Sequence, residues 1–499
     1  MSSYWALVLL FSAIANAYQT AFSNPVSGSF RASTYNEGLF TPMEDMNVLS
    51  ETEFSVLGHP EFPNYGVRIK KSAVCNDTTK AYTGYIDIEA RHIFFYFFES
   101  RNDPDTDDVI FWTNGGPGCS SSLGLFMELG PCRISDGNGP SVHPESWTTN
   151  ANIFFVDQPI GVGYSYADYG ETVGTTEEAA KDIAAFIFVF FEHFSKFKGR
   201  TFHMAGESYG GRYVPVFAAE VYDQNAKLAA AGYTPINLAS VMIGNGITDF
   251  YQQMSSSFDM LCTAASVPPT LDIASCVRMK QMIPRCEKRL KASCVDTFDA
   301  VDCAAAADFC GTHIEQPFSL LERNPYDISM PCDPENMGEN LCYPVTAHIR
   351  AHLSRPAVRA SLGVDAAVPA NFSSCAPAVG YAFGAQMDGL RASTNYVGAL
   401  LERGVRVLVY VGTYDWICNW VGNERWTLAL EWSGAEAFGA QTLHPWAVGG
   451  DFSGGRAGLA RSARGLTFVT VDAAGHMVPY DKPKEALDLV QRWLSGEGF

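Results

Sequence analysis

The chain has 499 residues, of which 47% are hydrophobic, so it can bury a large core in one large domain or in two or three ordinary ones. This composition excludes a chain that is disordered throughout. The formal net charge is −20 and no basic cluster stands out, so we expect neither nucleic acid nor an anionic membrane surface as a partner.

Residues 1–17 have the pattern of a signal peptide. An apolar run from Trp5 to Ile14 precedes Ala15-Asn16-Ala17, a small-x-small cleavage pattern, although the usual positive charge at the start is missing. The run is too short to cross a bilayer, and the apolar block at 183–191 has charges at both ends, as a buried helix would. We therefore expect a chain of the secretory pathway without a membrane anchor.

Residues 18–71 are polar, with scattered aromatic residues and weak periodicity. They are either an irregular N-terminal part of the fold or a propeptide. We favour the propeptide, because Lys70-Lys71 is a possible processing site just before the sequence changes character.

From residue 82 onward, strand patterns alternate with helix patterns. We expect strands at 82–88, 92–98, 109–113, 152–157, 201–204, 238–243, 405–411 and 466–471, and helices at about 175–194, after 212, and at 485–494. Thr175 and Glu178 have the spacing of a capping box at the start of the first helix. The alternation predicts an α/β fold with a mostly parallel sheet covered on both faces.

The pattern breaks between about 251 and 375, where nine of the thirteen cysteines lie among Ala-rich helical segments and loops. We interpret this region as an insertion that is held together by disulfides, because its own core is small. His348 and His352 have a metal-ligand spacing on a probable helix, but no third ligand accompanies them. A solvated helix face is the better interpretation, and we expect no metal.

Two further signals agree with a secretory chain. The cysteine count is thirteen, which predicts disulfides and at least one unpaired thiol. Asn76-Asp77-Thr78 and Asn371-Phe372-Ser373 are N-glycosylation sequons.

Three residues in chain order predict a nucleophilic site. Ser208 is the centre of a Gly-x-Ser-x-Gly motif between a predicted strand and a predicted helix, which is the setting of a nucleophile elbow. Asp415 and His476 each follow a later strand, at the edge where open α/β sheets place their sites. Each alone would be an ordinary turn or loop residue, but the order Ser, acid, His is that of an activated serine.

A glycine-rich segment, 112–119, follows the strand at 109–113. Glycines let a backbone approach a substrate closely, and this is where an α/β-hydrolase supplies one oxyanion donor. The other donor is the amide after the nucleophile, here that of Tyr209.

These motifs resemble those of the serine carboxypeptidases of the carboxypeptidase Y type. The matching stretches are 112–121, 156–165, 206–211, 415–420 and 475–479, and the resemblance extends from about residue 82 to the C-terminus. It implies an α/β-hydrolase domain at 72–499, with the insertion at about 251–375 as a helical cap, in an enzyme of a vacuole- or lysosome-like compartment or a secreted one.

The resemblance also implies roles for individual residues. Ser208 would be the nucleophile, His476 the general base and acid, and Asp415 the orienting carboxylate, with no cofactor. The implied substrate-binding groups are the oxyanion amides of Gly116 and Tyr209, the carboxylate-binding residues Asn114, Gly115, Glu207 and Glu128, and the leaving-residue pocket of Leu123, Met127, Tyr343 and Met477.

The implied substrates are the C-termini of peptides and proteins. The apolar pocket suggests a preference for hydrophobic C-terminal residues. Glu207 would have to hold a proton when a peptide carboxylate binds, which predicts peptide cleavage at acidic pH.

The resemblance further implies five disulfides and one free thiol. The pairs are Cys119–Cys375, Cys262–Cys276, Cys286–Cys310, Cys294–Cys303 and Cys332–Cys342, with Cys418 unpaired. Cys75 and Cys132 have no counterpart in the yeast vacuolar form of the family, so their pairing stays open, as does the oligomeric state.

Two other functions fit the same scaffold. Carboxypeptidase-like acyltransferases pass the acyl group to a small alcohol, and nothing in the sequence excludes this reaction. A non-catalytic binding protein of this fold is the third alternative, although the intact Ser208, Asp415 and His476 argue against it.

Overall fold

The computed structural model describes residues 43–59, 62–75 and 79–499, all of which belong to one structural unit. The predicted signal peptide and the sequon at Asn76 lie outside the described residues. Asn371, in the second sequon, is exposed on a loop.

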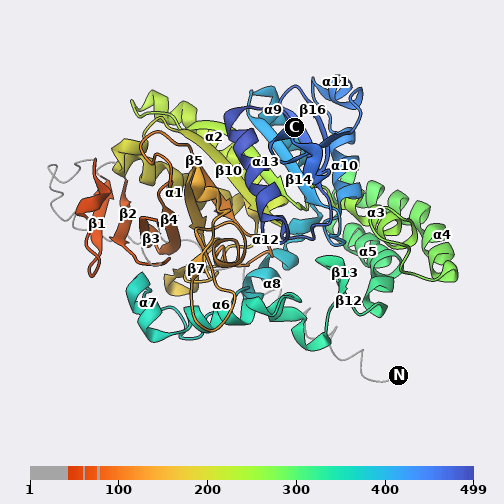
Figure 1. The fold of residues 1–499 in the computed structure, drawn as a ribbon, viewed down its shortest axis with the longest axis horizontal. Helices are drawn as coiled ribbons and strands as arrows, with labels where there is room; N and C mark the ends of the chain where they lie inside the picture. Colours follow the sequence, from red (N-terminus) through yellow and green to blue (C-terminus); the bar gives the residue numbers. More distant parts are fainter. Residues whose placement is uncertain (1–42, 60–61, 76–78) are drawn as a thin grey trace, which may run out of the picture. The chain divides into compact units, whose positions relative to one another are not determined.

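A mixed β-sheet forms the centre of this unit (Figure 1). Its middle consists of parallel strands, in the spatial order β8 (Asn152–Val156), β5 (Val109–Thr113), β10 (Thr201–Glu207), β11 (Asn237–Gly244), β14 (Arg406–Gly412) and β17 (Leu466–Val471). Antiparallel strands extend both sides: β1 (Ser55–His59), β2 (Phe62–Lys71), β3 (Ala81–Ile88) and β4 (Arg91–Phe98) next to β8, and β16 (Gly458–Ala463) and β15 (His444–Trp446) next to β17. The sheet is therefore parallel in its central half and antiparallel on both sides of it.

Helices cover both faces of the sheet. Successive side chains of a strand point to opposite faces, and in β5 Phe111 joins one apolar cluster whereas Ile110 and Trp112 join the other. The first cluster receives α1 (Thr176–His193), α2 (Gly210–Ala230), α9 (Thr394–Glu402) and α10 (Trp420–Ala429). The second receives the one-turn helix η2 (Gly124–Glu128), α12 (Val478–Asp481) and α13 (Pro483–Ser495), and Figure 1 shows α13 lying across the strands.

The predicted insertion has two structurally different parts. Helices α3 (Phe250–Cys262), α4 (Ile273–Leu290) and α5 (Ala300–Cys310) lie beside the sheet, at the right of Figure 1, around a small apolar cluster of their own. By contrast, α6 (Val345–Leu353) and α7 (Pro356–Leu362) pack Ile349, Leu353 and Leu362 against the main sheet. Three disulfides, Cys262–Cys276, Cys286–Cys310 and Cys294–Cys303, supplement the small core of the first part.

Six disulfides join Cys75–Cys132, Cys119–Cys375, Cys262–Cys276, Cys286–Cys310, Cys294–Cys303 and Cys332–Cys342. They include the five pairs that the family resemblance implies, and they pair the two cysteines that it leaves open. Cys418 is a buried free thiol.

The described end of the predicted propeptide belongs to the sheet. Strand β2 pairs with β3 from Tyr65 to Lys71 and buries Val67 and Ile69 completely. Lys70, in the predicted processing site, lies within this strand and is only 3% exposed. Removal of a propeptide stays a prediction, but the predicted processing site at Lys70-Lys71 is not a boundary between two structural units.

Among the described residues, every helix is either too short or too polar to cross a bilayer.

Candidate active site

The predicted nucleophile lies in a strained turn between β10 and α2. Ser208 has a φ of +63°, in the left-handed region that few side chains adopt. A β carbon on Gly206 would come within 2.7 Å of Val214, so this glycine is sterically required. At Gly210 the same atom would lie 3.5 Å from Thr113 O, an ordinary contact, so the second glycine of the motif is not required in this way.

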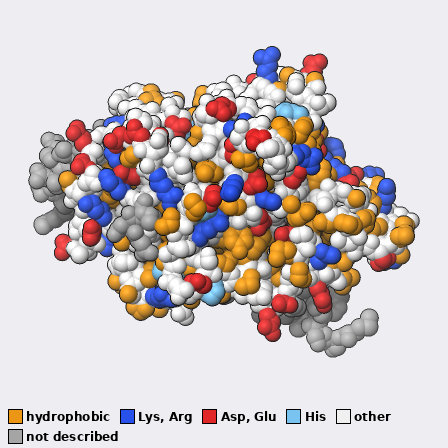
Figure 2. Space-filling view, viewed as in Figure 1, with side chains coloured by type: hydrophobic (Ala, Val, Ile, Leu, Met, Phe, Trp, Pro, Cys, Tyr) orange, Lys and Arg blue, Asp and Glu red, His pale blue; other side chains and the backbone are white. Residues whose placement is uncertain are grey.

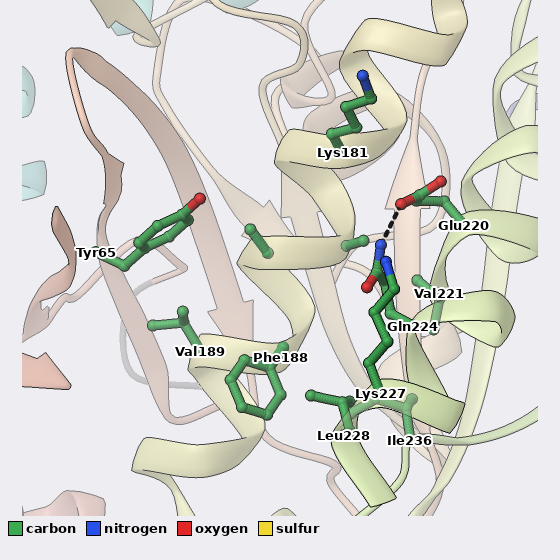
Figure 3. A pocket seen from close by; sticks show the side chains of 12 residues that line it. Tyr65, Lys181, Phe188, Val189, Glu220, Val221, Gln224, Lys227, Leu228 and Ile236 are labelled. Carbon is green, nitrogen blue, oxygen red and sulfur yellow. Dashed lines mark hydrogen bonds between the residues drawn. The ribbon is translucent and has the colours of Figure 1, made fainter. Parts of the chain in front are cut away.

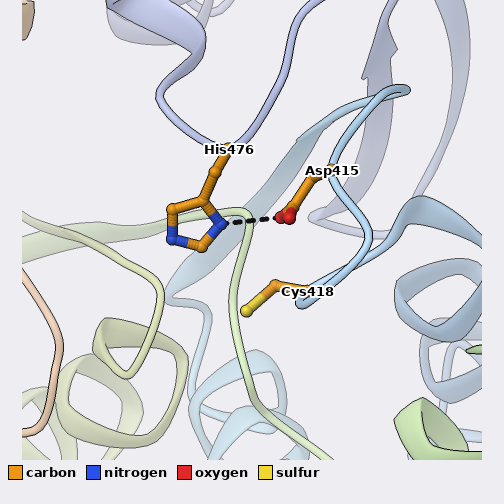
Figure 4. Close-up of side chains that lie close together, drawn as sticks. All are labelled: Asp415, Cys418 and His476. Carbon is orange, nitrogen blue, oxygen red and sulfur yellow. Dashed lines mark hydrogen bonds and ion pairs between the residues drawn. The ribbon is translucent and has the colours of Figure 1, made fainter. Parts of the chain in front are cut away.

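The predicted acid and the predicted base come from loops after two adjacent parallel strands, β14 and β17. His476 Nδ1 lies 2.7 Å from Asp415 Oδ2, and both side chains are buried (Figure 4). The amide of Asn245 donates to the same carboxylate oxygen at 2.8 Å. A proton held on Nδ1 by this carboxylate leaves Nε2 free to accept another proton.

A pocket of about 280 Å³ joins these loops to the nucleophile. Predicted residues that line it are Asn114, Gly115, Gly116, Leu123, Glu207, Ser208, His476 and Met477. The predicted pocket residues Met127 and Tyr343 instead belong to the apolar cluster on that face of the sheet, and neither is among the residues that line the pocket. The apolar and aromatic lining residues that sequence reasoning missed include Ile247, Tyr326, Leu341 and Ile417.

The glycine-rich loop after β5 lies against the nucleophile. A β carbon on Gly115 would overlap the amide nitrogen of Tyr209, and Gly116 has a φ of +115°. The amides of Gly116 and Tyr209 donate no backbone hydrogen bond to the described residues. Both are therefore available to a ligand in the pocket.

Two carboxyl groups share a buried site beside Ser208. Asn114 Nδ2 donates to Glu128 Oε1 at 3.2 Å and to Glu207 Oε1 at 3.5 Å. Burial raises the pKa of Glu128, and burial together with the charge of Glu128 raises the pKa of Glu207 well above its ordinary value. Two such groups coexist when one of them holds a proton, so the pair favours a protonated Glu207.

Asp415, Cys418 and His476 form a group whose potential ligand atoms lie within 4.8 Å of one another (Figure 4). This donor set does not fit a metal well. Asp415 already binds His476 and Asn245, and burial and the charge of Asp415 raise the pKa of the Cys418 thiol well above its ordinary value. A protonated thiol is a poor ligand.

A second cavity, of about 440 Å³, lies between α1 and α2 (Figure 3). Its walls are mostly apolar, and Figure 3 shows Lys181, Lys227 and the hydrogen-bonded pair Glu220 and Gln224 among its side chains. The residues that line it include no serine, threonine, cysteine or histidine. The predicted serine, acid and histidine instead meet at the pocket beside Ser208.

The sequence contained a signal that Asn245 belongs to the site. It follows β11 directly, between two glycines, and its side chain also accepts from the amide of Gly412 at 3.1 Å. A polar side chain at the C-terminal end of a central strand is a candidate site residue, as Asp415 is.

Comparisons with known proteins agree with one another. The sequence profile of the serine carboxypeptidase family matches residues 73–496. The chain is 40% identical over 441 residues to carboxypeptidase Y of Candida albicans, which covers 88% of this chain and 78% of that protein. It is 39% identical over 442 residues to carboxypeptidase Y of Komagataella phaffii, which covers 88% of this chain and 80% of that protein.

The fold has a solved relative. The crystal structure of Kex1(delta)p, a prohormone-processing carboxypeptidase from Saccharomyces cerevisiae, superimposes with a TM-score of 0.71 at 23% identity. The match covers 90% of this chain and 96% of that one, and at this identity it supports the fold alone.

Proposed function

Because the chain belongs to the serine carboxypeptidase family, we propose that it releases C-terminal amino acids from peptides through an acyl-enzyme on Ser208. The observation that carries this proposal is the 2.7 Å contact between His476 Nδ1 and Asp415, at a pocket that Ser208 also lines.

The proposed reaction has two halves. His476 Nε2 takes the proton of the Ser208 hydroxyl as its oxygen attacks the last peptide carbonyl, and the amides of Gly116 and Tyr209 stabilise the oxyanion. The imidazolium then gives its proton to the leaving amine, which departs as a free amino acid. Water, deprotonated by the same imidazole, hydrolyses the acyl-enzyme and restores Ser208.

Recognition of the C-terminus follows from the carboxyl pair. The amide of Gly115 and a protonated Glu207 can donate to a substrate carboxylate, and Asn114 Nδ2 can donate as well when it gives up its 3.5 Å bond to Glu207. An ionised Glu207 would instead repel that carboxylate. Cleavage of peptides is therefore favoured at acidic pH, where the pair holds its proton.

The leaving residue would contact Leu123 and Met477, with Tyr326 and Leu341 nearby in the same pocket. Apolar and aromatic walls favour a hydrophobic C-terminal residue over a charged one. The predicted signal peptide and the six disulfides support a place of action in the secretory pathway, in a vacuole-like compartment or outside the cell.

The deciding experiment compares wild type with Ser208→Ala on a blocked dipeptide and on its C-terminal amide. The wild-type enzyme should release the free amino acid from the dipeptide and should cleave the amide poorly. Ser208→Ala should catalyse neither reaction. Equal activity of Ser208→Ala and wild type would exclude Ser208 as the nucleophile. Equal cleavage of the dipeptide and of its C-terminal amide would exclude a site that recognises the substrate carboxylate.

A further inference from the structure

We propose that Asp157 is the positioning residue of the substrate-binding loop, residues 114–121, an inference that rests on the function proposed above. This loop supplies Asn114, Gly115 and Gly116 to the pocket. It leaves the sheet after β5, and Asp157 is the first residue after β8, the neighbouring parallel strand. The two chain segments therefore emerge side by side at the same edge.

Asp157 holds the end of the loop directly. Its side chain is completely buried, and Oδ1 accepts from the Ser120 hydroxyl at 2.5 Å and from the Ser121 amide at 3.1 Å. One carboxylate oxygen thus fixes two successive residues.

Ser121 transmits this restraint to the start of the loop. Its hydroxyl accepts from the Asn114 amide at 3.2 Å and donates to the Val156 carbonyl at 2.5 Å. Both ends of the loop therefore meet on Ser121, which in turn is bound to Asp157. A shift of this carboxylate would move the residues that meet the substrate carboxylate and the oxyanion.

The other carboxylate oxygen is held by the segment after Asp157. Oδ2 accepts from the Tyr164 amide at 3.0 Å. Gly163 has a φ of +54°, and a β carbon at this position would overlap Oδ2. The glycine before Tyr164 is required so that this amide reaches the carboxylate.

The hydrogen-bond partners of the Asp157 carboxylate are uncharged groups, namely the Ser120 hydroxyl and the amides of Ser121 and Tyr164. Burial raises its pKa to about 6, against the hydrogen bonds from Ser120, Tyr164 and Ser121. The ionisable side chains that interact with it are Tyr96 of β4 and Tyr164 of its own loop, and burial raises the pKa of both phenols far above neutral pH. Its bonds go to the substrate-binding loop and to the segment that follows Asp157.

The test measures steady-state kinetics of four variants: Asp157→Ala, Asp157→Asn, Ser121→Ala and Ser165→Ala. Ser165 is the matched control, because its hydroxyl donates to the Asp157 carbonyl and accepts from the Phe94 amide but forms no hydrogen bond with the loop. Substrates are a blocked dipeptide with a free carboxylate and a blocked amino-acid ester without one. Rates are divided by the amount of Ser208 that an organophosphonate labels, so that unfolded protein does not count.

For Asp157→Ala we expect a fall in kcat of about 100-fold on both substrates, the effect of misplacing an oxyanion donor by about 1 Å. KM should rise for the dipeptide and not for the ester, because only the dipeptide uses Asn114 and Gly115. Asp157→Asn keeps one acceptor oxygen and should recover part of the loss. Ser121→Ala should show the same pattern at smaller amplitude, and Ser165→Ala should match wild type.

Unchanged kcat and KM per labelled site in Asp157→Ala would overturn the proposal, even if the variant melts earlier. Should Asp157→Ala fail to fold, Ser121→Ala decides, because it keeps the bond from the Ser121 amide to Asp157 and removes the hydroxyl that links Asn114 to the Val156 carbonyl. These outcomes are separate from the nucleophile assignment, which Ser208→Ala tests alone.

Discussion

The backbone amide of His476 donates to the carbonyl oxygen of Tyr326 at 2.7 Å, so the insertion holds the loop of the proposed base directly. The Tyr326 ring also packs edge-on against the imidazole, 5.2 Å between centroids. One residue earlier, Pro325 O accepts from the amides of Trp416 and Ile417, next to the proposed acid. The segment around Tyr326 therefore fixes both members of the Asp415–His476 pair.

This contact predicts the effect of Gly475→Ala. A β carbon at Gly475 would overlap Tyr326 O and lie 3.0 Å from the Asp327 side chain, so the variant must displace the His476 loop. We expect kcat on a blocked dipeptide to fall by about 100-fold. Gly439→Ala is the control, because a β carbon there meets no atom within 4 Å, and similar losses in both variants would contradict this explanation.

The raised pKa of Glu207 predicts a pH dependence of KM. As the pH rises through this pKa, Glu207 ionises and repels the substrate carboxylate, so KM for a blocked dipeptide should increase while KM for an ester stays constant. In Glu207→Gln the side chain is neutral at every pH, and the dipeptide KM should lose most of this increase. A dipeptide KM that rises equally in the variant would assign the titration to another group.

Asp481 should lower the stability of the protein at neutral pH. Burial, with the charges of Asp327 and Glu128, raises its pKa from 3.8 to about 7, although the bond from the Gly475 amide opposes the shift. Between these two values the folded chain holds a proton that the unfolded chain has lost, so this contribution to the free energy of unfolding falls as the pH rises. At about 1.4 kcal/mol per pKa unit, the loss is at most about 4 kcal/mol.

The side chain in Asp481→Asn cannot ionise. The melting temperature of the variant minus that of wild type should therefore increase as the pH rises from about 4.5 to 7.5. The exposed Asp136→Asn serves as the control. A difference between Asp481→Asn and wild type that does not change with pH would show that the carboxyl keeps its ordinary pKa in the fold.

The disulfide Cys75–Cys132 should contribute to stability more than to catalysis. It closes a separation of 57 residues and joins the segment before β3 to the chain just after η2, which carries Glu128. Replacing both cysteines with Ala should lower the free energy of unfolding by about 2–4 kcal/mol, measured with denaturant. The dipeptide KM should change little, because Asn114 binds Glu128 independently of this link.

The central strands were predictable because they are short runs of β-branched, aromatic and other apolar residues that are buried on both faces. The expected ranges 109–113 and 466–471 coincide with β5 and β17. Strand β2 was missed, although Tyr65, Val67 and Ile69 alternate, because polar residues before them dominate the segment. Asn245 was missed as a site residue because its partner Asp415 lies 170 positions away, and only the adjacency of β11 and β14 brings them together.

The position of β2 has a consequence for producing the protein in a recombinant host. A shortened gene that begins after Lys71 would yield a sheet whose β3 has no neighbour on one side, together with apolar surface that Val67 and Ile69 now cover. Exposed edges of this kind pair with other chains and aggregate. Expression of the shortened enzyme should therefore give insoluble material, which co-expression of residues 43–71 as a separate peptide would rescue.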